Sequence, residues 1–303
     1  FAQQVDGEVS GIAYELLGKA KDLAKDLNAE VTAVLLGYGV KGLADSLAEY
    51  GADKVIVVDD KELEVYRTEP YAHALASVIN EYKPEIMLVG ATAIGRDLGP
   101  RVSARVATGL TADCTHLDID MDKYVNFLET SSTLDLSNTK FDMEDVNLKM
   151  TRPAFGGHLM ATIICPRFRP CMSTVRPGVM KKAPFSQERA DACVVEKYPV
   201  ALAKDDIKTQ VLDVVKEAKQ IVDLIGADVI VSVGRGIGKD IQKALDTKQW
   251  SVGANLSQNA QKDFINAHVR SQFPMYEVES IERKTDTLDG KETDYLYVTL
   301  KTS

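Results

Sequence analysis

Apolar residues along the first 110 positions follow two alternating patterns. Residues 9–27 place Ile12, Leu16 and Leu23 at steps of three and four, with lysine and aspartate between them, which predicts an amphipathic helix. The short apolar run at 31–37 predicts a strand that is buried on both faces. The same two patterns repeat and predict helices at 42–50, 68–82 and 96–108 and strands at 54–60 and 85–92. Strands that alternate with helices predict an α/β fold built on a parallel sheet.

The middle of the chain departs from this alternation. Residues 126–149 are polar, acidic and poorly periodic, which indicates a long loop or surface excursion. Apolar runs at 159–166 and 171–178 predict two strands of the sheet joined by a tight link. Residues 183–206 have weak periodicity and indicate a linker.

A second α/β domain is predicted beyond the linker. Residues 205–225 have helical spacing, 228–233 form an apolar run, and a glycine-rich turn leads into another helix over 234–245. The alternation then stops, and two β-rich runs around Leu288-Asp289-Gly290 predict an antiparallel hairpin. The predicted divisions are a first domain at 1–182, a linker at 183–206, the start of a doubly wound domain at 207–245 and an atypical segment at 246–303.

Composition and charge narrow the range of partners. The chain has 36 Lys and Arg against 45 Asp and Glu, for a net charge of −9, which argues against bulk binding of nucleic acid or an anionic membrane. No apolar run reaches the roughly 18 residues of a membrane helix, so membrane insertion is not expected. Four cysteines without a CxxC pair and four histidines without ligand spacing predict no metal site and a reducing, cytoplasmic setting.

Three segments could bind an anionic ligand, and each also has a plain structural interpretation. Residues 90–105 join a strand to a helix that carries Arg96, Arg101 and Arg105, or they are an ordinary turn with surface arginines. Arg-Pro occurs twice, at Arg152 and at Arg176, each time near glycine. Either each proline fixes a guanidinium group where it can stabilise negative charge on a ligand, or each arginine only joins two loops through a carboxylate. The run Gly234-Arg235-Gly236 follows a predicted strand and opens a helix, as in a phosphate cradle or a simple glycine turn. No catalytic nucleophile stands out.

Several of these segments together carry a family resemblance. They are GATAIGRDLGPRVSAR at 90–105, GLTADCT at 109–115, the long block at 151–180 and VIVSVGRGI at 229–237. In combination they resemble the α subunit of electron-transfer flavoproteins, over residues 1 to about 245. The Arg-Pro-Ala-Phe-Gly-Gly and Val-Arg-Pro-Gly runs resemble the electron-bifurcating branch of that family.

The resemblance implies a heterodimer with a β subunit, a first domain that packs on that subunit and a second domain that carries a shuttle FAD. In bifurcating members a second FAD in the β subunit accepts hydride from NADH, and electrons pass to ferredoxin or flavodoxin and to an acyl-CoA dehydrogenase-type partner. Oxidoreductase activity is then expected only in the complex. The resemblance implies that Arg152 tunes the flavin of the β subunit. It also implies that two groups of residues bind cofactor: Gly234, Arg235 and Gly236, which approach the FAD phosphates, and Arg176, which lies near the subunit interface.

The family's later FAD-holding segments are absent after Leu245, so the shuttle FAD is not expected to bind in the usual way. Three alternatives therefore stay open. The chain is a non-bifurcating carrier that accepts electrons from dehydrogenases, a stand-alone ATP- or AMP-binding α/β protein, or a structural subunit that only completes a partner's flavin site.

Overall fold

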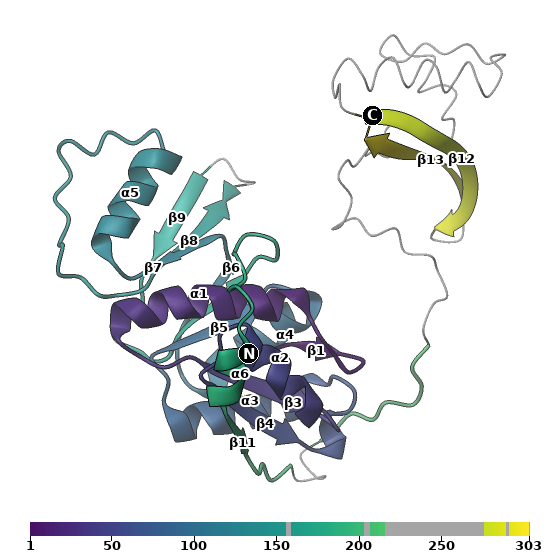
Figure 1. The fold of residues 1–303 in the computed structure, drawn as a ribbon, viewed down its shortest axis with the longest axis horizontal. Helices are drawn as coiled ribbons and strands as arrows, with labels where there is room; N and C mark the ends of the chain where they lie inside the picture. Colours follow the sequence, from purple (N-terminus) through teal and green to yellow (C-terminus); the bar gives the residue numbers. More distant parts are fainter. Residues whose placement is uncertain (156–158, 203–206, 216–275, 289–290, 303) are drawn as a thin grey trace. The chain divides into compact units, whose positions relative to one another are not determined.

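A computed structural model describes residues 1–155, 159–202, 207–215, 276–288 and 291–302 (Figure 1). The chain divides into two units, 1–214 and 215–303, which are described separately.

Two three-stranded parallel sheets form the centre of the first unit. One has the strand order β11-β4-β3 and the other β5-β10-β6. Their strands are β3 (Thr32–Gly37), β4 (Lys54–Asp59), β5 (Ile86–Gly90), β6 (Leu110–Cys114), β10 (Cys171–Val175) and β11 (Val194–Lys197). The parallel α/β fold predicted for this part of the chain is confirmed.

The first two residues link these sheets. The amino group of Phe1 donates to the carbonyl of Leu88 in β5 at 2.7 Å, while Ala2 makes a parallel bridge with Leu35 in β3. The short pair β1 (Gln4–Val5) and β2 (Glu8–Val9) then turns the chain into the first helix.

Helices cover the strands on both faces, because alternate strand residues point to opposite sides. The helices of the first unit are α1 (Gly11–Leu27), α2 (Ala44–Glu49), α3 (Thr68–Tyr82), α4 (Ala93–Arg105), α5 (Met121–Ser131) and α6 (Gln187–Ala192), with 3₁₀ turns η1 (Lys41–Leu43) and η2 (Lys61–Leu63). Leu35 and Val57 pack with α1 and α2, whereas Leu36 and Val58 pack with α3 and α4. The result is a layered α/β/α core.

A smaller antiparallel sheet extends from this core (Figure 1). It contains β7 (His116–Asp118), β8 (Lys149–Ala154) and β9 (Leu159–Ile163), in that order. The runs at 159–166 and 171–178 therefore enter different sheets, since β9 pairs with β8 and β10 lies between β5 and β6. The predicted excursion at 126–149 begins inside α5, so its first residues are helical.

The segment predicted as a linker, 183–206, carries α6 and β11. Strand β11 pairs in parallel with β4, and Glu196 of β11 makes an ion pair with Lys54 at 2.5 Å. The helix predicted from residue 205 is not present at 207–215, and residues 216–225 lie outside the described part. An amphipathic stretch needs a surface to pack against before it forms a stable helix. The domain limits themselves remain predictions.

The second unit is described only as a hairpin. Strand β12 (Tyr276–Leu288) pairs antiparallel with β13 (Lys291–Thr302), from Tyr276↔Thr302 to Leu288↔Lys291. These two strands lie in the segment where the sequence predicts a hairpin, and the assignment of that segment stays a prediction. Among the described residues of the whole chain, no helix is both long and apolar enough to cross a membrane.

Candidate functional site

Charged side chains gather where β10 and β6 end. Arg176 follows the last residue of β10, Asp113 lies near the end of β6, and Arg96 belongs to the helix that follows β5. The carboxyl ends of parallel strands meet at one edge of a sheet, which is where α/β proteins bind ligands. The fold thus brings Arg96 and Arg176, 80 positions apart in sequence, to one carboxylate.

Asp113 is the centre of this cluster. Its carboxylate accepts from Arg176 at 2.5 Å and from Arg96 at 3.2 Å. Its backbone has a φ of +62°, at a point where the pairing of β6 with β10 is irregular. The backbone N–H of Asp113 donates to the hydroxyl of Thr174 at 2.8 Å, which holds this unusual conformation. Aspartate and asparagine tolerate the left-handed region better than most residues.

The ion pairs set the charge state of Asp113. The hydrogen bond from Arg176, with the charges of Arg176, Arg96 and Arg152, holds the pKa of its carboxyl below the usual range. The group is therefore ionised at neutral pH, and the three guanidinium groups outweigh its one negative charge.

Asp113→Asn is expected to lower stability by about 1 kcal/mol at pH 7, since the pairs are partly exposed to solvent. Asparagine keeps the left-handed backbone, so the loss reports on the charge. Because the folded-state pKa is depressed, this stabilisation is present above the unfolded pKa near 4 and disappears as pH falls through the lower folded value. Urea unfolding of both proteins between pH 3 and 7 would show it. A difference that stays constant down to pH 3 would contradict this role.

Arg152 approaches the same cluster from β8. It is half-buried, and its Nε atom is enclosed without a hydrogen-bond partner. Its positive charge is close enough to lower the pKa of Asp113 and to oppose the rise that burial imposes on Cys114, whose pKa reaches about 12. A buried donor without an acceptor costs roughly 1–3 kcal/mol, and no described residue offers this atom an acceptor.

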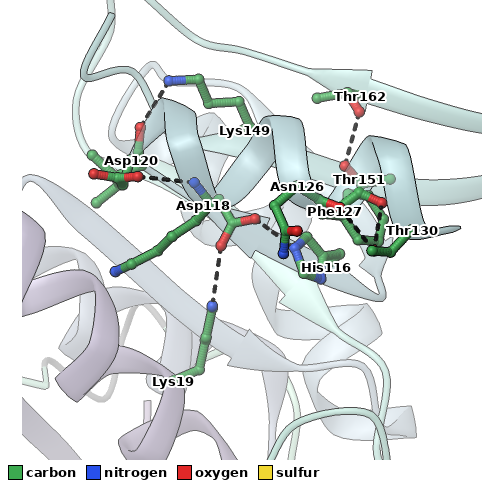
Figure 2. A network of polar contacts seen from close by, with 12 residues as sticks. Lys19, His116, Asp118, Asp120, Asn126, Phe127, Thr130, Lys149, Thr151 and Thr162 are labelled. Carbon is green, nitrogen blue, oxygen red and sulfur yellow. Dashed lines mark hydrogen bonds and ion pairs between the residues drawn. The ribbon is translucent and has the colours of Figure 1, made fainter. Parts of the chain in front are cut away.

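A network of polar contacts connects β7 and the first residue of β8 to their surroundings (Figure 2). Asp118, 4% exposed, binds His116 at 2.5 Å and Lys19 of α1 at 3.5 Å. The His116 ring stacks on Phe127 of α5, with ring centres 3.7 Å apart. Lys149, at the start of β8, donates to the carbonyl of Ile119 at 2.8 Å. These contacts fix β7 to α1 and α5, and Lys149 joins β8 to the residue that follows β7.

The far end of β8 and the strand β9 expose apolar side chains. Phe155 is 80% exposed, and Leu159 and Met160 of β9 are both more than half exposed. Exposed large apolar side chains close to a charged site are a feature of protein-binding surfaces.

The structure separates the arginines that the sequence grouped at 90–105. Arg96 joins Asp113, but Arg101 and Arg105 both bind Glu69 of α3. The backbone N–H of Gly95 already donates to the hydroxyl of Thr92. The predicted cofactor residues Gly234, Arg235 and Gly236 lie outside the described residues. Asp113 was not predicted, and its only sequence signal is a charge inside the short strand segment at 109–115.

Comparison with known proteins gives a consistent assignment. The family model of the electron transfer flavoprotein domain matches residues 1–203. The chain is 62% identical over 242 residues to the acryloyl-CoA reductase electron transfer subunit beta of Anaerotignum propionicum, which covers 80% of this chain and 66% of that protein. It is 46% identical over 238 residues to the electron transfer flavoprotein subunit alpha of Clostridium acetobutylicum, covering 78% and 64%.

A third relative is named lactate dehydrogenase (NAD(+),ferredoxin) subunit LctC, from Acetobacterium woodii. It is 38% identical over 237 residues, which cover 78% of this chain and 50% of that protein. The chain thus spans less than two thirds of the length of these relatives.

Proposed function

The chain belongs to the electron transfer flavoprotein family, as an α-type subunit, and from that premise we propose that it pairs with a β subunit and completes that subunit's flavin site. The complex would take electrons from NADH and bifurcate them, one path leading to ferredoxin or flavodoxin and the other to an acyl-CoA dehydrogenase-type partner. Oxidoreductase activity would belong to the complex.

The unpartnered Nε of Arg152 is the observation that carries this proposal. It is a buried, positively charged donor group, and the described residues offer it no acceptor. A guanidinium held in this way by β8 is prepared to stabilise negative charge on an electron-rich ring from outside the chain. Arg176 would lie near the same subunit interface, held by Asp113.

Electron transfer flavoproteins bind FAD, which supplies the redox chemistry of the complex. The arginine-rich edge formed by Arg96, Arg152 and Arg176 fits an anionic or electron-rich group. Gly234, Arg235 and Gly236 are proposed to approach the phosphates of the shuttle FAD, as the family pattern implies. This chain's own contribution at the first site is to orient a positive charge and to exclude water with β8 and β9.

The exposed apolar side chains of β8 and β9 support the pairing with a β subunit. Phe155 follows Arg152 by three positions, and Met160 and Leu159 pair with Pro153 and Ala154, the two residues of β8 that follow Arg152. Burial of this surface by a partner would remove apolar area from water and would bring the partner's cofactor towards Arg152.

The bifurcating branch is supported by the names of relatives. One is an electron transfer subunit of acryloyl-CoA reductase, and another belongs to a lactate dehydrogenase that uses NAD and ferredoxin. These names suggest an acyl-CoA type of acceptor and a ferredoxin acceptor respectively. The non-bifurcating carrier remains the alternative.

FAD content per αβ heterodimer tests the proposal. Co-expression with a β subunit is expected to give a stable heterodimer with at least one FAD that NADH reduces. One FAD would mean that this chain serves as a wall of the β-subunit site without a working shuttle site. Two FAD would mean that residues beyond Leu245 hold the shuttle FAD in another way. A chain that binds ATP or AMP alone and ignores the β subunit would overturn the proposal.

A further inference from the structure

The connection from β9 to β10 carries two cysteines that neither the fold nor the proposed function explains. The sequence Cys165-Pro166-Arg167-Phe168-Arg169-Pro170-Cys171 places one thiol at each end of a short loop. Both are free; Cys171 is buried at the start of β10, while Cys165 is half-buried.

The loop folds back so that its two ends meet. The Cys171 thiol donates to the carbonyl oxygen of Cys165 at 3.4 Å, and the Cys165 thiol donates to the carbonyl oxygen of Phe168 at 3.6 Å. The Cys171 thiol therefore lies against the backbone of Cys165 before any reaction.

Arg169 and Thr108 hold the loop in this shape. The Arg169 guanidinium donates to the carbonyls of Cys165 at 2.9 Å and Phe168 at 3.1 Å, and it pairs with Glu85. The hydroxyl of Thr108 donates to the carbonyl of Pro170 at 2.9 Å. The positive charge of Arg169 opposes the rise that burial causes in the pKa of Cys171.

The two thiols have different accessibility. Burial raises the pKa of Cys171, so Cys165 is the thiol that an external reagent meets first. Cys114 is fully buried, and its thiol donates to the carbonyl oxygen of Thr111. Cys193 lies between α6 and β11, a strand of the other sheet, and its thiol donates to the carbonyl oxygen of Val194.

We propose that Cys165 and Cys171 form a reactive dithiol that closes to an intramolecular disulfide by exchange with a low-molecular-weight disulfide. The Cys165 thiolate attacks one sulfur of the reagent, which forms a mixed disulfide and releases one thiolate. Cys171, in its thiolate form, attacks the Cys165 sulfur, which forms the internal disulfide and releases the second thiolate. Two protein thiols are oxidised, the reagent is reduced to two thiols, and the two protons from the protein pass to the leaving thiolates.

Oxidised glutathione acting on the full chain is the test, followed by alkylation, trypsin and mass spectrometry. Trypsin cuts after Arg167 but not before the prolines, so Cys165 and Cys171 fall in the separate peptides 150–167 and 168–181. The expected product is this pair of peptides joined by one disulfide, in a chain lighter by two hydrogen atoms, and restored by dithiothreitol.

Matched variants decide the assignment. Cys193→Ser is expected to keep the joined peptides, whereas Cys165→Ser abolishes them and Cys171→Ser leaves one glutathione on Cys165. All three are small changes at cysteines, and a circular dichroism melt shows whether each folds. Peptides joined through Cys114 or Cys193, a link between two chains, or four unchanged thiols in the folded wild type would overturn the proposal. The outcome does not depend on FAD or the β subunit, so it is separate from the proposed function.

Discussion

Replacing Arg152 by alanine is expected to lower the reduction potential of the flavin in the β subunit of the complex by roughly 30–65 mV. A lost hydrogen bond to a charged group costs about 1.5–3 kcal/mol, and 30 mV corresponds to about 1.4 kcal/mol for a two-electron couple. The sign follows from the charge, because a guanidinium favours the more negative, reduced state. The Nε of Arg152 has no hydrogen-bond partner among the described residues, so its removal breaks no hydrogen bond of that atom within this chain.

A redox titration of the purified heterodimer measures the effect. Arg152→Lys keeps the charge and is expected to recover part of the potential, but not the planar geometry. Arg101→Ala is the matched control, since Arg101 pairs with Glu69 on the far side of α4 and away from the cluster. An unchanged potential in Arg152→Ala, with the heterodimer intact, would remove Arg152 from the flavin site.

Gly95→Ala is expected to destabilise the protein by about 3 kcal/mol or more. A Cβ at this position would lie 1.8 Å from the carbonyl oxygen of Gly90, at the end of β5. Backbone is the obstacle here, so a side-chain rotation cannot relieve the clash and the start of α4 must move away from the strand. The next residue, Arg96, would move with it and lose its contacts with Ala91 and Asp113.

Gly11→Ala is the matched control for that experiment. Gly11 begins α1, and a methyl group added there would have no other atom within 4 Å, so alanine should be neutral or slightly stabilising. Chemical unfolding of the two variants gives the comparison. Equal unfolding midpoints for Gly95→Ala and Gly11→Ala would show that α4 can shift without cost.

The elements with strong periodicity were predictable, and those defined by distant partners were not. Helix α3 runs over Thr68–Tyr82, as its apolar spacing and its early proline predict. By contrast, β9 and β10 have similar apolar sequences but enter different sheets. The spacing of apolar residues does not show which strand an apolar segment pairs with. For the same reason, β11 looks like part of a linker in the sequence, and only its pairing with β4 shows that it is a strand of the sheet.

The site shows the same division. The Arg-Pro pairs indicated Arg152 and Arg176 because proline stiffens the backbone beside the arginine and nearby glycine lets a ligand or chain come close. Asp113 gave no comparable signal, since its role depends on a left-handed backbone and on arginines from two other elements. Residues 90–105 and the second Arg-Pro pair were predicted as separate candidate sites. They share one site because β10 lies beside β5 in the sheet, which spacing along the sequence does not show.

The position of β10 also shapes how the protein is made. This strand lies between β5 and β6, yet the ribosome delivers it about 85 residues after β5 is complete. At roughly 5–20 residues per second, the inner edge of β5 waits on the order of 4–17 s for its neighbour. During that time its apolar faces and unpaired backbone resemble the exposed edges that chaperones bind and that associate between nascent chains. We therefore expect the yield of folded protein to depend on how fast residues 91–175 are synthesised.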